Sequence, residues 1–169
     1  MRQSLRYERS AVLAGEWWRL LTGHLVHTDL RHLSLNVAGT CLVGVLFGRD
    51  YSVRQWLFIL MLSAAAIDVA FVFYEPQLEW YVGLSGILHG CIAAGLIAWL
   101  RYENRLLTLA LAAMLIAKLC WEQYRGPLPL SGDMPVVVDA HFYGAIGGAL
   151  AAASIAVLRQ RWPRRSTSL

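Results

Sequence analysis

Long apolar stretches, separated by short polar connectors, make up most of this chain. A helix needs roughly 20 apolar residues, with a range of about 17–25, to cross the hydrocarbon core of a bilayer. The pattern predicts five such helices, at His32–Gly48, Trp56–Tyr74, Gly83–Leu100, Leu106–Trp121 and Val136–Leu158. The expected fold is therefore all-α, a polytopic membrane helical bundle.

The composition also indicates a membrane protein, and the placement of its charges argues against a nucleic-acid partner. Hydrophobic residues make up 57% of the chain and charged residues 15%, whereas soluble proteins carry about 25% charged residues. The net charge of +4 does not indicate nucleic acid, because the arginines lie at the ends of apolar segments rather than on a basic patch. We expect a lipid bilayer as the surroundings and no nucleic-acid partner. Cysteines 41, 91 and 120 lie in apolar segments without CxxC spacing, which argues against a disulfide framework or a zinc knuckle.

The arginines also predict an orientation, because basic residues in short loops mark the cytoplasmic side of a membrane. The connectors 49–54 and 101–105 and the tail 159–169 hold eight arginines, whereas the connectors 75–82 and 122–135 hold one. This places the C-terminus in the cytoplasm and residues 83–85 near the outer side of the membrane.

The first 31 residues do not follow this alternation. They contain five arginines, yet the alternation places them outside. We therefore expect that a first transmembrane helix is missing from the chain, or was lost at a misassigned start. Residues 1–14 are predicted to be a polar lead-in to a membrane domain at 15–158. Within that domain, Gly15–Leu30 mixes tryptophans with polar residues, which favours an interfacial or re-entrant element.

Ser85 is a candidate nucleophile at the start of the third predicted helix. Its small neighbours Gly83 and Gly86 leave the hydroxyl accessible. A helix N-terminus adds unpaired N–H groups and a positive dipole end, which favour a developing oxyanion. The alternative is a serine that caps or packs the helix.

His141 is a candidate base, about one turn into the last predicted helix. An unpaired histidine at this depth is costly, so it indicates function, the alternative being a structural histidine bound to a backbone carbonyl. Gly144 lies on the same helix face, as Gly86 does on the serine helix, and such small residues let membrane helices pack closely. We expect a hydrogen bond of about 2.6–3.2 Å between the Ser85 hydroxyl and a His141 ring nitrogen.

Other polar residues in the apolar segments are candidates for supporting roles. His32 and Asn36 share a helix face and suit an oxyanion hole, or are polar contacts between helices. His89 follows Ser85 by one turn. It either packs against, hydrogen-bonds and orients His141, or has a direct role by competing with it as base or contacting substrate. Asp139 does not face His141, because residues two apart on a helix diverge, so the prediction is a dyad without an acid.

Two charged residues inside predicted spans need polar surroundings. Asp68 lies midway along the second span and must face a polar partner, which the sequence does not name. Lys118 in the fourth span is expected to extend its ammonium toward the membrane interface.

Four motifs in this order resemble the rhomboid family of intramembrane serine proteases. They are Trp18-Arg19, the HxxxN motif at residues 32–36, the GxSGxxxG motif at residues 83–90 and the AHxxG motif at residues 140–144. The form Gly-Leu-Ser-Gly-Ile-Leu-His-Gly, with Gly-Glu-Trp-Trp-Arg upstream, is similar to the rhombosortase branch.

The resemblance implies a six-helix core, of which five helices are visible here, and a serine endopeptidase without a metal or other cofactor. It implies Ser85 as nucleophile and His141 as base. It implies oxyanion support from His32, Asn36 and the backbone N–H of Ser85, with Gly83 as a further stabilising residue. His89, Gly86 and Gly144 would orient these groups or contact substrate. For the rhombosortase branch it implies single-span substrates with a C-terminal Gly-Gly motif, a hydrophobic helix and a basic tail. The enzyme would lie in the bacterial inner membrane, with its active site toward the periplasm.

Two other functions remain open at this stage. One is a catalytically silent, rhomboid-like protein that binds membrane anchors. The other is a metal-dependent membrane protease built from histidines 24, 27, 32, 89 and 141, which the lack of an HExxH motif disfavours.

Overall fold

The computed structural model describes residues 2–101, 104–129 and 135–161. It contains five main helices: α4 (Leu30–Phe47), α5 (Val53–Phe73), α6 (Ser85–Trp99), α7 (Arg105–Arg125) and α8 (Val138–Arg161). Helices α4, α5, α7 and α8 are long and apolar enough to cross a membrane, whereas α6 is a shorter apolar helix of 15 residues. Each predicted segment corresponds to one helix, so the predicted polytopic helical bundle is confirmed.

Polar side chains at their N-termini define where several helices begin. Asp29 Oδ1 accepts a 2.8 Å hydrogen bond from the His32 N–H and caps α4. Ser52 and Gln55 form a reciprocal capping box at the start of α5. Asn104 Oδ1 accepts from the first N–H groups of α7. These caps satisfy donors that the first turn of a helix leaves unpaired.

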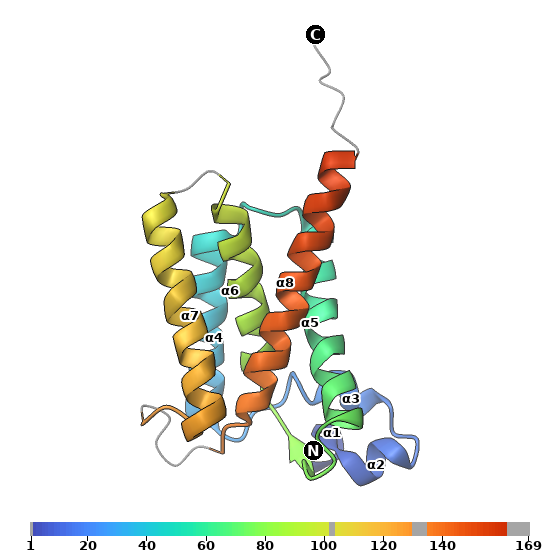
Figure 1. Cartoon of the computed structure of the whole chain (residues 1–169). Coiled ribbons are helices and arrows are strands. Elements are labelled where there is room, and N and C mark those ends of the chain that lie inside the picture. Colours follow the sequence, from blue (N-terminus) through green and yellow to red (C-terminus); the bar gives the residue numbers. More distant parts are fainter. Residues whose placement is uncertain (1, 102–103, 130–134, 162–169) are drawn as a thin grey trace.

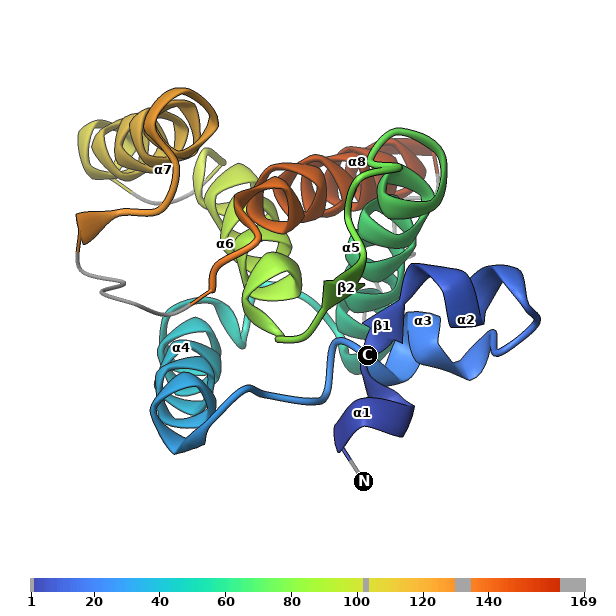
Figure 2. The same cartoon turned by 90° about the horizontal axis from the view of Figure 1, so that it is seen from below.

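Helix α6 is the centre of the bundle. It lies between the pair α4 and α7 and the pair α8 and α5 (Figure 2), and most of its residues are buried. The apolar side chains of α4 and α7 are largely exposed, as expected of helices that face lipid. The chain is therefore a multi-pass membrane protein with a mostly apolar central helix.

Glycines bring α6 and α8 into direct backbone contact. A Cβ added to Gly90 would lie 2.5 Å from the Gly144 carbonyl oxygen, and one added to Gly144 would collide with the Gly86 carbonyl group. Gly148 meets Gly90 in the same way. The predicted close packing of the serine and histidine helices through these glycines is confirmed.

The N-terminal residues fold against one end of this bundle. They form α1 (Arg2–Leu5), β1 (Tyr7–Glu8), α2 (Arg9–Leu13) and α3 (Trp18–Thr22). Strand β1 pairs antiparallel with β2 (Trp80–Tyr81), with Tyr7 opposite Tyr81. Tyr7 and Val12 are fully buried and belong to the hydrophobic core, so this segment is anchored by side chains as well as by backbone pairing.

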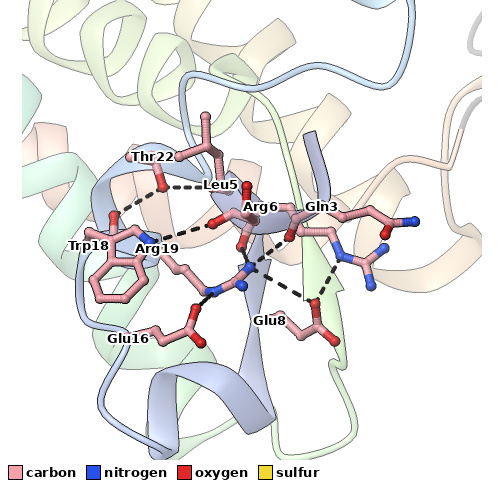
Figure 3. A network of polar contacts seen from close by, with 9 residues as sticks. Gln3, Leu5, Arg6, Glu8, Glu16, Trp18, Arg19 and Thr22 are labelled. Carbon is pink, nitrogen blue, oxygen red and sulfur yellow. Dashed lines mark hydrogen bonds and ion pairs between the residues drawn. The ribbon is translucent and has the colours of Figure 1, made fainter. Parts of the chain in front are cut away.

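Arg19 holds the N-terminal elements together (Figure 3). Its guanidinium donates to the carbonyl oxygens of Gln3 and Arg6 at 2.7 and 3.0 Å, and to Glu16 Oε2 at 2.6 Å. The arginine of the Trp18-Arg19 motif is thus a buried structural link rather than a surface charge.

Both candidate helices begin at the end of the bundle that carries the N-terminal elements (Figure 1). The connector between α4 and α5 and the end of α8 lie at the opposite end, with the start of α7. The predicted basic tail lies outside the described residues from position 162 onward.

Candidate active site

Ser85 and His141 meet where α6 and α8 begin. The Ser85 Oγ atom is 2.9 Å from His141 Nε2, within the expected hydrogen-bond range. Ser85 is the first residue of α6, and His141 lies in the first turn of α8 and is 5% exposed. A hydroxyl and an imidazole are thus in contact at the buried crossing of two closely packed helices.

The turn before Ser85 depends on Gly83. Its φ of +125° lies in the region that side chains disfavour, and an added Cβ would stand 2.7 Å from the His32 ring. The Gly83 N–H donates to the Gly23 carbonyl at 3.0 Å, and the Tyr81 hydroxyl donates to the Gly83 carbonyl at 2.5 Å. Burial of Tyr81 raises the pKa of its hydroxyl, so this donor keeps its proton at neutral pH.

A cavity of about 360 Å³ opens beside the pair. Ser85, His141, His32, Asn36 and His89 all line it. Gly86 and Gly144 lie instead at the contact between α6 and α8. The cavity therefore brings together the side chains that the sequence pattern singled out, on three different helices.

His32 and Asn36 form the wall provided by α4. Asn36 is buried and donates one N–H to the His32 carbonyl at 3.2 Å, which leaves a second N–H on the same nitrogen. His32 Nδ1 lies 3.2 Å from the Thr28 hydroxyl, whereas His32 Nε2 is directed toward Gly83. When Nδ1 accepts from Thr28, the proton is on Nε2, which is then a donor directed toward Gly83 in the turn before Ser85.

His89 packs directly on the candidate base. Its ring stacks on that of His141 with 4.1 Å between centroids and a 21° angle between planes. Its Nδ1–H donates to the Ser85 carbonyl at 2.7 Å, because a carbonyl oxygen only accepts. Of the alternatives for His89, the geometry matches packing and orientation of His141.

Two charged residues of α7 complete the surroundings of His141, and sequence reasoning missed both. Glu122 Oε2 is 2.9 Å from His141 Nδ1 and 2.6 Å from Lys118 Nζ. The expectation of a pair without a neighbouring carboxylate is therefore wrong. Lys118, which was expected to extend its ammonium toward the membrane interface, contacts Glu122 and the two histidine rings. A Lys and a Glu four apart at the end of an apolar helix form an i,i+4 pair, which was the signal in the sequence.

Asp139 and Asp68 have other partners. Asp139 accepts from Gln123 Nε2 at 3.2 Å, in agreement with the argument that it does not face His141. Asp68 accepts from His24 Nε2 at 3.2 Å, and His24 is 1% exposed. His24 is thus the partner that the sequence did not name.

The remaining histidine, His27, stands beside the α4 wall. Its ring meets that of His32 edge to face, with 5.0 Å between centroids. Burial lowers the pKa of His27, so it is neutral at pH 7. Within the described ranges, no group of three or more His, Cys, Asp or Glu side chains is placed to hold a metal ion.

Comparisons with known proteins agree with this arrangement. The Rhomboid domain model matches residues 14–157. Rhomboid protease GluP of Bacillus subtilis (strain 168) is 32% identical over 87 residues, which are 52% of this chain and 17% of GluP. The protein named "Putative rhomboid protease YdcA" of the same strain is 27% identical over 139 residues, 82% of this chain and 67% of YdcA. No solved structure matches.

The family model covers both candidate residues and all five main helices apart from the end of α8. The aligned part of the chain spans less than a fifth of the length of GluP and about two thirds of the length of YdcA. The chain belongs to the rhomboid family of membrane proteins.

Proposed function

We propose that this protein is an intramembrane serine endopeptidase with Ser85 as nucleophile and His141 as general base. The observation that carries the proposal is the 2.9 Å contact between Ser85 Oγ and His141 Nε2 in a cavity among apolar helices. Its rhomboid protease relatives support intramembrane proteolysis at the level of the family.

The chemistry follows from the two atoms in contact. His141 Nε2 takes the hydroxyl proton while Ser85 Oγ attacks a peptide carbonyl carbon. The tetrahedral intermediate collapses when the C–N bond breaks and the His141 imidazolium gives its proton to the leaving amine. A water molecule, deprotonated by the same nitrogen, then hydrolyses the acyl–serine ester and restores the hydroxyl.

The negative charge on the substrate oxygen needs donors, and we assign three from residues that line the cavity. They are the free N–H of Asn36, the Nε2–H of His32, and the backbone N–H of Ser85 at the start of α6. Gly83 lets the first two approach, because any side chain there would meet the His32 ring. One such donor typically contributes about 10²–10³ in rate.

The proposed substrates are single-span proteins with a C-terminal Gly-Gly motif, a hydrophobic helix and a basic tail. The support is the form of the motif at residues 83–90, which is similar to the rhombosortase branch. The proposed location is the bacterial inner membrane, with the active site toward the periplasm and the C-terminus in the cytoplasm. The support is that the arginine-bearing connector between α4 and α5, the start of α7 and the end of α8 lie opposite the end of the bundle where α6 begins (Figure 1).

Labelling with a fluorophosphonate probe in membranes tests the nucleophile. We expect the wild type to be labelled and Ser85→Ala to be unlabelled. His141→Ala should be labelled at least 10²-fold more slowly, because general base catalysis contributes about 10²–10⁴. Labelling of Ser85→Ala at the wild-type rate would reject the assignment.

Co-expression with a Gly-Gly-tailed protein tests the substrate class. The mass of the released product is compared between wild type and Ser85→Ala, with a substrate whose Gly-Gly is changed to Val-Val as control. A silent anchor-binding protein would retain the substrate and give no product in any variant. Equal cleavage of both substrates would leave a protease of another specificity.

A further inference from the structure

Glu122 is an unusual residue for its helix. The apolar side chains of α7 are mostly exposed, and its buried residues are Thr108 and Glu122. The Glu122 side chain is 3% exposed, less than any neighbour on the same turn. Burying a carboxylate costs free energy unless the group is paired and hydrogen-bonded. The contacts with His141 and Lys118 offset this cost for Glu122.

One oxygen of Glu122 makes both contacts. Oε2 lies 2.9 Å from His141 Nδ1 and 2.6 Å from Lys118 Nζ. A carboxylate oxygen only accepts, so His141 Nδ1 must carry a proton when this hydrogen bond forms. The proton of a neutral imidazole is then on Nδ1, and Nε2, the atom that faces Ser85 Oγ, has a free lone pair. This is the tautomer in which His141 acts as a base.

Lys118 could favour the opposite tautomer if Glu122 were absent. Its Nζ is also 3.0 Å from His141 Nδ1, and an ammonium that donates there would place the imidazole proton on Nε2. The contact with Glu122 is the shorter one, and the third neighbour, His89 Nε2 at 2.7 Å, takes another Lys118 proton. His89 accepts there because its own proton is on Nδ1, bound to the Ser85 carbonyl.

The charges act in the same direction as the hydrogen bonds. When His141 takes the serine proton it becomes an imidazolium beside the Lys118 ammonium, which repels it. Glu122 Oε2 is in direct contact with both cations, and its negative charge offsets this repulsion at close range. The groups that face His141 are Ser85 and His89 of α6 and Lys118 and Glu122 of α7, with His32 of α4 across the cavity. Asp139 on its own helix is a nearby charge that binds Gln123 instead.

We propose that Glu122 is a positioning residue that fixes the His141 tautomer and stabilises its imidazolium, and that Lys118 is the counter-ion of Glu122. The proposal rests on the proposed serine protease function. It turns the predicted dyad into a Ser85–His141–Glu122 triad whose third member comes from α7.

A double-mutant cycle on the cleavage reaction tests it in the full-length protein. Glu122→Gln keeps the shape but removes the charge, so we expect kcat to fall by about 10²–10⁴ with KM changed less than threefold. The double variant Lys118→Met/Glu122→Gln should have a kcat at least tenfold higher than that of Glu122→Gln alone, because the unpaired ammonium is gone. A purely structural role predicts the reverse, since the double variant loses more packing than either single variant.

Conservative variants serve as controls. Glu122→Asp should retain more activity than Glu122→Gln, because it keeps the negative charge. Asp139→Asn removes a carboxylate two residues from His141 that binds Gln123 instead, and it should stay within twofold of wild type. A Glu122→Gln protein with wild-type kcat, or no recovery in the double variant, would overturn the proposal.

The Ser85→Ala and Glu122→Gln variants distinguish failure of the proposed function from failure of the proposed role of Glu122. If Ser85→Ala still cleaves, the proposed function fails; if Ser85→Ala is inactive and Glu122→Gln is fully active, only the role of Glu122 fails. Should Glu122→Gln not fold, ¹⁵N NMR of the His141 ring in the wild type decides instead. We expect a proton on Nδ1 and none on Nε2 in neutral His141, and the opposite tautomer would refute the proposal.

Discussion

A single methyl group at Gly86 tests whether the close contact of α6 and α8 sets the serine–histidine geometry. An alanine Cβ at this position would stand 2.7 Å from the Ala140 carbonyl oxygen and 2.8 Å from Ile67 Cδ1. The isoleucine methyl group can move aside, because it is the end of a side chain. The carbonyl belongs to the backbone next to His141, so it moves only together with α8.

The size of the effect follows from these distances. A carbon and a carbonyl oxygen in contact are normally about 3.3 Å apart, so α8 must retreat from α6 by about 0.6 Å. Applied to the 2.9 Å contact between Ser85 Oγ and His141 Nε2, this gives about 3.5 Å, beyond hydrogen-bond reach. Because a 1 Å misplacement of catalytic groups reduces rate by about 10²-fold, we expect Gly86→Ala to lose between tenfold and 10²-fold.

The stability of the variant should change much less than its reactivity. Overpacking lowers the free energy of unfolding by about 1–3 kcal/mol, whereas replacing glycine by alanine inside a helix raises it by about 1 kcal/mol. The net loss is therefore small, and the variant should remain folded.

The assay is the second-order rate constant of fluorophosphonate labelling, with thermal unfolding in detergent measured in parallel. Gly44→Ala is the matched control, because nothing lies within 4 Å of a Cβ at Gly44, and its labelling rate should not change. Wild-type labelling by folded Gly86→Ala would refute the claim that glycine packing sets the active geometry.

Two further substitutions separate oxyanion support from the folding of the N-terminal elements. Asn36→Ala should lower kcat by about 10²–10³ with little change in KM, measured by steady-state cleavage, and an unchanged kcat would exclude Asn36 from the oxyanion hole. Arg19→Ala removes the bonds to the Gln3 and Arg6 carbonyls and should lower the free energy of unfolding by roughly 2–4 kcal/mol. Limited proteolysis should then cut within residues 2–13. Arg19→Lys should be cut as well, because an ammonium lacks the planar fork of a guanidinium. Full protection from proteolysis in either variant would contradict this role of Arg19.

The parts of the fold that depend on local pattern were predictable from the sequence. Apolar stretches of about 20 residues define membrane helices, and the structure has a helix at each predicted segment. The contact of Ser85 and His141 was also predictable, because glycines on the same faces indicate where two membrane helices approach each other. The spacing of the glycines on α6 and α8 determines which faces of the two helices meet.

Contacts between distant residues were not predictable in the same way. Tyr7 pairs with Tyr81 in a two-stranded sheet, and His24 binds Asp68 across 44 residues. Two-residue strands have no usable hydrophobic period, and a hydrogen-bonded pair such as His24 and Asp68 shows in the sequence as two isolated polar residues. Only the tertiary fold makes them partners.

Glu122 shows how the position of a helix boundary limits inference about a site. The predicted fourth helix ended at Trp121, which left Glu122 in a connector, whereas α7 continues to Arg125. One further turn of helix places Glu122 one turn from Lys118 and facing His141. Since Ser85 and His141 come from α6 and α8, the full polar arrangement exists only when α7 is packed against both. Any movement of α7 away from the bundle would separate Glu122 from His141 before it disturbed the serine–histidine contact, so α7 docking and the reactivity of the base are linked by the same hydrogen bond.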